Sequence, residues 1–418
     1  MTTPHDAACV PHGRDLAIRA KHLLTLAGEK PARAFDLFRP LDIIDNGLVL
    51  IRNGLVAYAG PYRPSELAGQ SPASVTDAGD VCIMPGLVNA HTHLQLSWLE
   101  GRLCLGQGFA TWLRSLIPLL GSYDEIRARG ALDSASDALA ACGTAHVGDV
   151  GGSICGMLPQ VAAALARRGL RASHFCENFG HGPPLVDGKS VWPPRCRDDI
   201  GALQAHPPAR ASFAPAGHAL YSTAPAVLCR AREYCRQKGL IFSFHLAESP
   251  EENLMLEGGA GPLHACYKGA VLPDDWQAPA MRPLAFAESL GLDGAGVLAV
   301  HGAQLSAAEA RRLGASGSAL CLCPRSNRLI GVGDADAGML IESGLLCCLG
   351  TDGLTSNTDL DVRNEAVFLA REQGLPTQAL VRMLTVNGAA ALGRPAWQAS
   401  LVAGAPGILS ILPPELHL

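Results

Sequence analysis

The chain has 418 residues, of which 48% are hydrophobic and 17% are charged, and its formal net charge is −5. This composition supports a large buried core, and the lack of basic runs argues against nucleic acid or an acidic membrane surface as a partner. The first twelve residues read as a loose tail without a signal segment, and no apolar stretch predicts a membrane span. Fourteen cysteines in such a chain favour free thiols in a reducing cytoplasm.

Short strand-like segments open the sequence. Strands are predicted at 16–20, 47–51 and 55–59. Asn53-Gly54, between the last two, is a strong hairpin signal. Because this group buries little by itself, we expect the C-terminal segment 407–412 to add a strand to it. We therefore predict a small β-sandwich domain built from both termini, residues 1–80 and 396–418.

Between these ends, apolar runs alternate with Ala- and Leu-rich helical stretches. Eight strands are predicted, at 81–90, 143–150, 171–177, 210–216, 240–246, 296–301, 318–323 and 345–351. The segments between them are helical in composition, for example 131–142, 158–168, 224–238 and 307–313. Glycine often closes such a helix, as at residues 169, 239, 314 and 344. This alternation predicts a (β/α)₈ TIM barrel over residues 81–395. A doubly wound sheet is the alternative, but no Gly-x-Gly-x-x-Gly follows an early strand.

Polar side chains follow most of these strands, at the ends where a barrel carries its chemistry. They are His91 and His93, His218, His245 with Glu248, His301, Arg325 to Asn327, and Asp352. Singly, such a histidine is more often a hydrogen-bonded residue and such an aspartate a helix cap. Their joint placement instead favours one shared site. We expect His146, His174 and His181 to lie behind this site or at the surface.

Metal binding is the chemistry that this set suits best. Three histidines and a carboxylate suit one Zn²⁺, with Fe²⁺ as the alternative. The predicted ligands are His91, His93, His245 and Asp352. A metal-bound water would be acidified towards neutrality. Glu248 is placed to shuttle its proton and His301 to assist. No strand end carries a lysine suited to bridging two metals, so a single metal is predicted.

Several motifs together resemble the amidohydrolase superfamily over nearly the whole chain. The carriers are Pro85-Gly86-Leu87-Val88-Asn89-Ala90-His91-Thr92-His93-Leu94, His245-Leu246-Ala247-Glu248, Val300-His301-Gly302, and Leu349-Gly350-Thr351-Asp352-Gly353 with Ser356-Asn357. Within it, the chain is similar to the mononuclear deaminases and chlorohydrolases, which include methylthioadenosine/adenosylhomocysteine deaminases, guanine deaminases and triazine hydrolases. The resemblance implies that Glu248 protonates a ring nitrogen. It also implies that His301 and Asp352 handle the attacking water and the leaving ammonia.

A narrower resemblance is to the aminodeoxyfutalosine deaminases of menaquinone biosynthesis, carried by the stretch from Cys323 to Gly331. Their substrate joins a benzoate carboxylate to an adenosine-like body, and the Arg325 fork suits that carboxylate. A solvent-facing loop charge is the alternative for Arg325. His218, Trp112 and Asn327 complete the expected substrate-binding residues, although Trp112 and Phe109 are equally compatible with the core. The segment His218-Ala219-Leu220-Tyr221-Ser222 departs from the usual His-Ala-Pro-Tyr-Ser.

The leading hypothesis is therefore a metal-dependent hydrolytic deaminase, with aminodeoxyfutalosine as the specific substrate. The alternatives are a deaminase of methylthioadenosine, adenosylhomocysteine or guanine, a chlorohydrolase of the triazine type, and a barrel with a purely structural metal site. Glu248 and His301 argue against the last, because a structural site needs neither. The expected partner is a small-molecule substrate, and the oligomeric state stays open, with a homodimer as one option.

Overall fold

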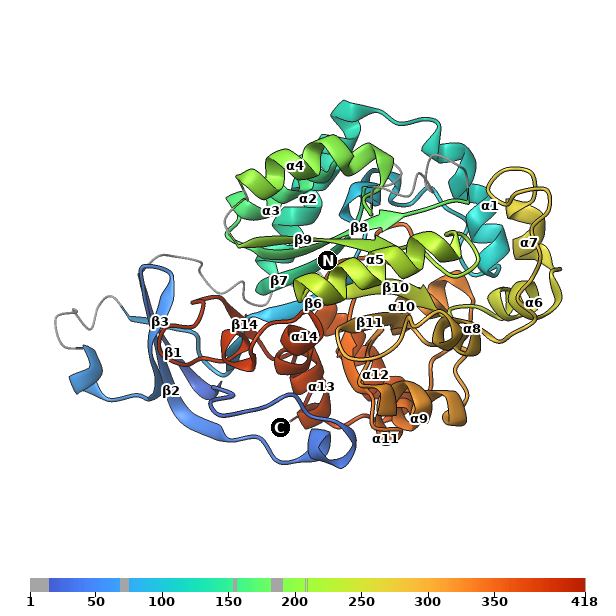
Figure 1. Ribbon diagram of the computed structural model, residues 1–418. Helices are drawn as coiled ribbons and strands as arrows, with labels where there is room; N and C mark the ends of the chain where they lie inside the picture. Colours follow the sequence, from blue (N-terminus) through green and yellow to red (C-terminus); the bar gives the residue numbers. More distant parts are fainter. Residues whose placement is uncertain are drawn as a thin grey trace.

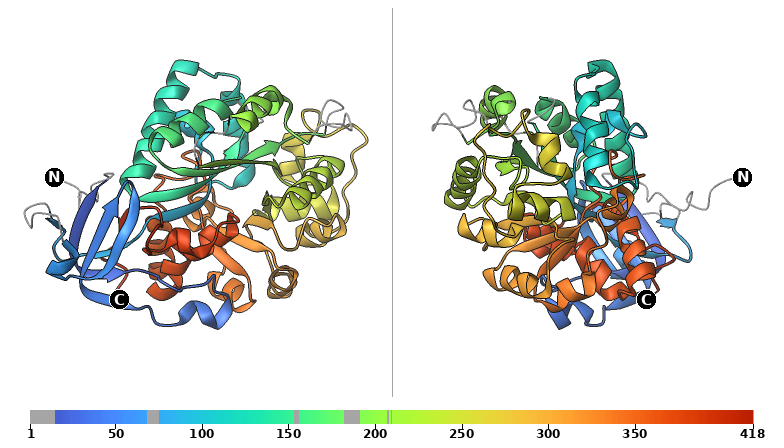
Figure 2. Two further views of the ribbon diagram at one scale, coloured as in Figure 1. Left: turned by 60° about the vertical axis from the view of Figure 1, so that its left-hand side comes forward. Right: turned by 90° about the vertical axis from the view of Figure 1, so that its right-hand side faces the viewer.

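The computed structural model describes residues 15–67, 75–152, 156–181, 191–206, 208 and 210–417. The predicted tail at residues 1–12 lies outside these ranges. The described strands form three β-sheets, one of six strands and two of four, with helices packed around the pair of four (Figures 1 and 2). Within these ranges, no helix is long and apolar enough to cross a membrane.

The six-stranded sheet joins the two ends of the chain. Its strands are β1 (Leu16–Leu24), β2 (Ile43–Arg52), β3 (Leu55–Pro61), β4 (Val75–Asp77), β5 (Cys82–Pro85) and β14 (Leu409–Ile411). The predicted hairpin is confirmed, because Asn53 and Gly54 link β2 to β3 with φ of 52° and 75°. The C-terminal strand β14 pairs antiparallel with β5, as expected. The described strands here form a single sheet, so the predicted two-layer sandwich is not confirmed.

Eight further strands occur in the predicted order, as two parallel sheets of four. The first contains β6 (Leu87–Thr92), β7 (Thr144–Gly151), β8 (Arg171–Asn178) and β9 (Ala211–Gly217). The second contains β10 (Phe242–Leu246), β11 (Val297–His301), β12 (Ala319–Leu322) and β13 (Leu346–Leu349). In each sheet, neighbours in sequence are neighbours in space, the arrangement that follows when a helix connects parallel strands.

The strand ladder is interrupted where the two sheets meet, so the expected closed barrel is not confirmed. At the seam between β9 and β10, the amide of His245 donates to the carbonyl of His218 at 2.9 Å. At the seam between β13 and β6, the amide of Asp352 donates to the carbonyl of His91 at 3.1 Å. The Asn89 side chain also bridges this second seam, since its Oδ1 accepts from the Thr351 amide at 3.1 Å. The Asn89 side chain thus replaces a backbone carbonyl that would accept this hydrogen bond in a continuous strand ladder.

The predicted strand at 81–90 is wrong in one respect, because it is two strands. Its first half, β5, pairs with β1 and β14, whereas its second half, β6, pairs with β7. The switch occurs at Gly86, whose amide donates to Ile408, while the next amide, of Leu87, donates to Gly143. Both halves are fully buried, and Asn89 is the one polar side chain of β5 and β6 before residue 91, so the two halves look alike in sequence.

Helices lie on the outer side of the two parallel sheets (Figure 2). They are α1 (Phe109–Leu120), α2 (Glu125–Ala141), α3 (Leu158–Arg167), α4 (Arg197–Ala205), α5 (Pro225–Lys238), α6 (Pro250–Gly258), α7 (Pro262–Tyr267), α8 (Pro283–Ser289), α9 (Ala307–Ser316), α10 (Pro324–Ile330), α11 (Ala337–Glu342), α12 (Val362–Gln373), α13 (Thr377–Leu384) and α14 (Val386–Ala391). Short 3₁₀ turns occur at Ala34–Phe38, Pro64–Leu67, Leu94–Leu99, Pro194–Cys196 and Ala396–Ala399.

Capping residues explain where the observed helices differ from the predicted ones. Helix α2 begins earlier than predicted, because the Asp124 side chain accepts the amide of Arg127. Helix α9 begins at a capping box formed by Ser306 and Glu309. It runs past Gly314, the predicted stop, and ends before Gly317, whose φ is 94°.

A buried arginine ties the N-terminal segment to the helices. Arg382 on α13 is fully buried. Its guanidinium binds the Glu29 carboxylate through Nε at 3.0 Å and Nη2 at 2.9 Å. Its Nη1 donates to the carbonyls of Leu37 at 3.0 Å and Arg39 at 2.7 Å. The segment that follows β1 is therefore held by one guanidinium against the helical layer.

Candidate active site

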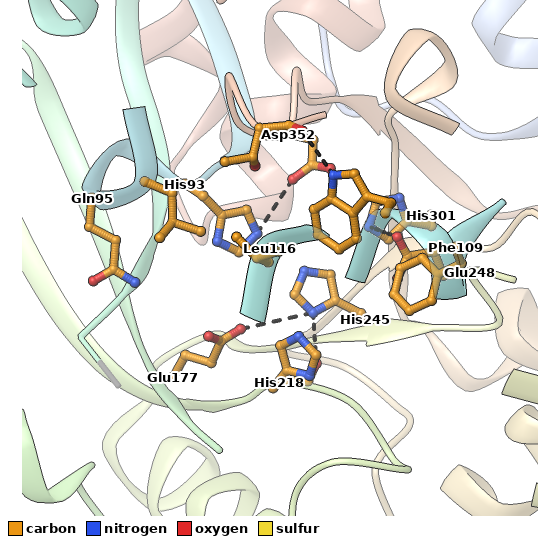
Figure 3. Close-up of a pocket in the computed structure, with 13 residues that line it drawn as sticks. His93, Gln95, Phe109, Leu116, Glu177, His218, His245, Glu248, His301 and Asp352 are labelled. Carbon is orange, nitrogen blue, oxygen red and sulfur yellow. Dashed lines mark hydrogen bonds and ion pairs between the residues drawn. The ribbon is translucent and has the colours of Figure 1, made fainter. Parts of the chain in front are cut away.

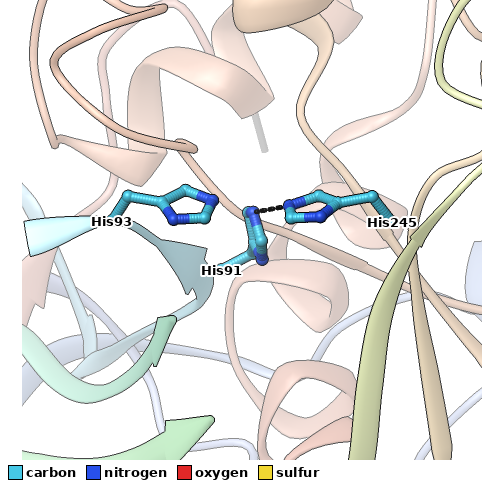
Figure 4. Close-up of side chains that lie close together, drawn as sticks. All are labelled: His91, His93 and His245. Carbon is cyan, nitrogen blue, oxygen red and sulfur yellow. Dashed lines mark hydrogen bonds between the residues drawn. The ribbon is translucent and has the colours of Figure 1, made fainter. Parts of the chain in front are cut away.

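The four predicted metal ligands lie together at the ends of the parallel strands. His91 and His93 come from the end of β6 and His245 from β10 (Figure 4). The Nε2 atoms of His91 and His245 are 3.3 Å apart. Asp352 Oδ1 lies 3.6 Å from Nε2 of His91 and 3.4 Å from Nε2 of His93. The three histidines each offer a ligand atom within 4.8 Å of the others, so one small cation can contact all of them.

Hydrogen bonds fix which histidine nitrogen faces the centre of this cluster. Nδ1 of His245 lies 2.8 Å from the carbonyl oxygen of His218. A carbonyl only accepts, so Nδ1 carries the proton and Nε2 presents a lone pair. Burial lowers the pKa of both His91 and His245. Two imidazole nitrogens that face each other at 3.3 Å are placed to share one cation.

Asp352 is held as a carboxylate and oriented towards the histidines. Ser326 and Ser356 donate to its Oδ2 at 2.7 and 2.6 Å, which leaves Oδ1 to face His91 and His93. Although burial opposes ionisation, the hydrogen bond with His91 and the neighbouring histidines hold the pKa of Asp352 well below its usual range. The site therefore offers one anionic oxygen and three imidazole nitrogens, a donor set that Zn²⁺ and Fe²⁺ prefer.

Three residues of this site have a strained backbone. Ala247, His301 and Asp352 have φ of 51°, 73° and 58°, in the left-handed region that non-glycine residues rarely adopt. Each such residue costs about 1–3 kcal/mol. All three follow or end a parallel strand, where the turn redirects the chain at the cluster. Strain at these positions is typical of a functional site.

Glu248 and His301 form an acid–acceptor pair beside the cluster. Oε1 of Glu248 lies 3.6 Å from Nε2 of His301, and Nδ1 of His301 lies 3.0 Å from Oδ1 of Asn327. Burial raises the pKa of Glu248, and the negative charge of Asp352 raises it further. Burial lowers the pKa of His301 to about 4. Both shifts favour a proton on Glu248 and a neutral imidazole on His301, whose Nε2 presents a lone pair to that proton.

These side chains open into one cavity, shown in Figure 3. Its lining consists of His93, Gln95, Leu96, Phe109, Trp112, Leu116, Glu177, His218, His245, Glu248, His301, Asp352 and Thr355. Trp112 is held on the wall by its Nε1, which donates to the Thr355 carbonyl at 2.8 Å. Burial lowers the pKa of His218 to about 3, so this imidazole is neutral. The cavity thus joins an apolar aromatic wall to the polar cluster, as small-molecule sites do.

Two predicted substrate-binding residues do not line this cavity in the described part of the chain. Arg325 binds both carboxylate oxygens of Asp359, at 3.0 and 2.8 Å, and its amide donates to Glu365 at 2.9 Å. Its fork already holds a carboxylate, so the interpretation that it binds one from the substrate has no support here. Asn327 is fully buried and contacts His301, so it positions that imidazole instead.

Gln95 and Glu177 are among the cavity-lining residues that the sequence reasoning missed. Glu177 is the last residue of the predicted strand 171–177, so the expectation that strand ends carry the chemistry applied to it. At that strand end, however, only the nearby histidines were considered. His174 instead lies behind the site, 3.0 Å from Asp149, and His146 contacts Ser173 at 3.1 Å. Gln95 carried no signal, since an isolated glutamine after a strand is ordinary.

The buried carboxyl of Glu252 makes the free energy of unfolding depend on pH. Glu252 is fully buried, its Oε2 accepts the Glu248 amide at 2.8 Å, and burial raises its pKa from 4.5 to about 7. The folded state therefore binds this proton more tightly than the unfolded state, and the advantage is lost as pH rises from 4.5 through 7. In the wild type, this effect lowers the free energy of unfolding by up to ~3 kcal/mol between pH 5 and 8, and we expect Glu252→Gln to abolish that decrease.

Urea unfolding at four pH values between 5 and 8 measures this effect. Glu233→Gln is the matched control, because Arg236 holds the pKa of the exposed Glu233 at about 2, below this window. The idea fails if wild type and Glu252→Gln show parallel pH profiles.

Comparisons with known proteins agree with this geometry. The Amidohydrolase family model matches residues 82–412. The chain is 29% identical over 398 residues to a 5-methylthioadenosine/S-adenosylhomocysteine deaminase of Nitratidesulfovibrio vulgaris, covering 90% of this chain and 83% of that one. It is 28% identical over 357 residues to an aminodeoxyfutalosine deaminase of Deinococcus radiodurans, covering 83% and 81%.

The fold matches that of a solved structure. Helicobacter pylori aminofutalosine deaminase, in complex with methylthio-coformycin, superposes with a TM-score of 0.77 at 20% identity, over 95% of this chain and 91% of that chain. At this identity, the likeness concerns the fold. The family model, by contrast, spans most of the sequence, including every predicted ligand and the Glu248–His301 pair. The chain therefore belongs to the Amidohydrolase family and is a hydrolase that acts on C–N bonds.

Proposed function

We propose that this protein is a metal-dependent deaminase that releases ammonia from an adenosine-like nucleoside, with 6-amino-6-deoxyfutalosine as the first candidate substrate. The observation that carries the proposal is the pairing of a proton-bearing Glu248 with a neutral His301 beside the histidine–aspartate cluster. Hydrolysis of an aminated ring needs an acid for the ring nitrogen and an acceptor for the proton of water. The relatives named as nucleoside deaminases support this choice of reaction.

A divalent metal ion is part of the proposal, with zinc first and ferrous iron second. His91, His93, His245 and Asp352 would hold it, because their facing atoms form a compact set of three nitrogens and one oxygen. When bound there, such an ion supplies Lewis acidity that lowers the pKa of water towards neutrality.

The chain's own residues then account for each proton. Glu248 donates its proton to the ring nitrogen next to the reacting carbon. Water adds to that carbon, and its proton passes to Nε2 of His301 or to Oδ1 of Asp352. The proton then goes to the amino group, and the C–N bond breaks to release ammonia. The hydroxyl left on the carbon returns its proton to Glu248, which restores the acid and leaves a carbonyl. The buried surroundings of Glu248 serve this step, because they keep the acid protonated until a base is in place.

The aromatic wall suits the flat base of the substrate. Phe109 and Trp112 lie 5.5 Å apart between ring centroids, with their planes 33° apart, and both line the cavity. Trp112 cannot turn away without losing its bond to the Thr355 carbonyl. In this proposal, the two rings hold the base against Glu248.

A second candidate is a methylthioadenosine or adenosylhomocysteine deaminase. The specific observation in its favour is that Arg325 is already bound to Asp359, which removes the predicted partner of a benzoate carboxylate. The reaction and the catalytic residues are the same for both candidates.

Ammonia release from a substrate panel tests the proposal. We expect the metal-loaded protein to deaminate at least one of aminodeoxyfutalosine, methylthioadenosine, adenosylhomocysteine and adenosine, and to act poorly on guanine and on a chlorotriazine. Turnover of methylthioadenosine without turnover of aminodeoxyfutalosine would select the second candidate. Turnover of the chlorotriazine alone, or of none, would contradict the proposed function.

A further inference from the structure

Arg325 stands out in the sequence, and the proposed chemistry does not use it. It opens a run of three polar residues in the first turn of helix α10. The next residue, Ser326, donates to Asp352 at 2.7 Å. Oδ1 of the third, Asn327, lies 3.0 Å from Nδ1 of His301. We infer that Arg325 is a positioning residue, which ties the loop between β13 and α12 to α10 and so fixes Asp352 relative to His301. This inference rests on the proposed function for the roles of those two groups.

The loop between β13 and α12 carries two parts of the site. It contains Asp352, which lines the cavity shown in Figure 3. Thr355 also lines the cavity, and its carbonyl holds Trp112 on the aromatic wall through a bond of 2.8 Å. Ser356 donates to Oδ2 of Asp352 at 2.6 Å. A displacement of this loop would therefore move a predicted ligand and the aromatic wall together.

Arg325 binds the end of this loop that lies next to α12. Its Nη1 and Nη2 donate to Oδ1 and Oδ2 of Asp359 at 3.0 and 2.8 Å. Two parallel bonds of this kind fix both the distance and the relative orientation of the two groups. Only 16% of the Arg325 side chain is exposed, so solvent screens this pair less than a pair on the open surface. The loop is thus bound to the helix that carries Ser326.

A buried carboxyl group links the start of the loop to the same helix. Glu365 on α12 is fully buried, and its Oε2 accepts the backbone amide of Arg325 at 2.9 Å. Its Oε1 accepts from Nδ2 of Asn357 at 2.8 Å. The same nitrogen of Asn357 donates to the carbonyl of Thr351 at 2.7 Å. Both ends of the loop are therefore connected to the first turn of α10, one through Glu365 and Asn357 and the other through Asp359.

The alternative role for Arg325, binding a carboxylate of the substrate, predicts a different loss. In the described part of the chain, the cavity lining does not include Arg325, and Asp359 occupies its fork. Loss of a positioning residue lowers the rate for every substrate, because the reacting groups are misplaced. Loss of a carboxylate-binding residue weakens only a substrate that carries a carboxylate. The two roles can therefore be separated by experiment.

Kinetics on two substrates make this separation. The metal-loaded Arg325→Met protein would be compared with wild type on aminodeoxyfutalosine, which carries a carboxylate, and on 5′-methylthioadenosine, which does not. We expect kcat to fall about 10- to 100-fold on each substrate that the wild type turns over, with KM changed by less than about threefold. Arg325→Lys keeps the charge but lacks the fork, so it should lose about 3- to 10-fold, and it replaces Arg325→Met if that variant does not fold.

The absorption spectrum of the cobalt-loaded protein tests the positioning without any substrate. The visible bands of Co²⁺ held by the clustered ligands depend on ligand geometry and therefore report on the placement of Asp352. We expect Arg325→Met to shift or weaken these bands. Asp359→Asn should change them in the same direction, and the double variant should show no larger change than Arg325→Met alone, because both substitutions break one contact.

Arg328→Met is the matched control, because Arg328 lies on the same helix and pairs with Asp334 and Glu372 at the surface. It should change neither kcat nor the cobalt spectrum. The inference is overturned if Arg325→Met leaves the cobalt spectrum unchanged, or if it raises KM for aminodeoxyfutalosine alone. A wild-type protein that releases no ammonia from the panel would overturn the proposed function instead, and the cobalt spectrum would then decide the inference by itself.

Discussion

Glu248→Gln is expected to lower the rate of ammonia release by about 10²- to 10⁴-fold while the protein keeps its metal. Glutamine has nearly the same shape but cannot give up a proton, so only the acid function is lost. Glu248 contacts His301 and is not one of the four clustered ligands, so metal content should not change. Steady-state kinetics on the best substrate of the panel, with elemental analysis of the same sample, measures both quantities.

Glu257→Gln serves as the control for this change, because Glu257 lies on the neighbouring helix α6 and is exposed. It should retain full activity. If Glu248→Gln deaminates at the wild-type rate, then the acid is elsewhere. If instead it loses the metal, Glu248 has a role in the cluster that its position does not suggest.

Arg382→Ala is expected to lower the free energy of unfolding by ~3–5 kcal/mol, the cost of leaving a buried ion pair with one partner. Arg382 is fully buried, and Glu29 and two backbone carbonyls depend on it. Its removal leaves those oxygens without their donors and opens a cavity under the N-terminal segment. Urea denaturation followed by circular dichroism gives the value.

Arg371→Ala, on helix α12, provides the comparison. Arg371 is largely exposed and pairs with Glu415 at 3.3 Å, so its loss should cost at most ~1 kcal/mol. Equal losses in the two variants would show that Arg382 contributes no more than a surface charge.

The positions of the strands and of the clustered ligands were accessible from sequence, and the reason is physical. Buried parallel strands require continuous apolar runs, and the residues that follow them must lie at one edge. His91, His245 and Asp352 each follow or end such a run, so their meeting was predictable from chain order alone. Gly-rich turns and helix caps marked most of the remaining boundaries.

What sequence did not reveal depends on which partner a residue meets. Arg325 looked suited to a ligand because Asp359, its actual partner, lies in a loop 34 residues away with no pattern of its own. Gln95 became notable only when Gly152 was found to fix its amide. The split of the strand at Gly86 was hidden because apolar residues flank it on both sides, and apolar character does not tell which sheet a strand joins.

The break between the two parallel sheets has a consequence for the ligand cluster. His91 and His93 belong to one sheet, whereas His245 and Asp352 belong to or follow strands of the other. The backbone bonds that cross the two seams involve three of the four clustered ligands and their neighbour, namely His91, His245, Asp352 and His218. An ion bound by these side chains would therefore connect the two four-stranded sheets directly. Its loss would weaken the connection between the two sheets, so we expect metal content and resistance to unfolding to fall together.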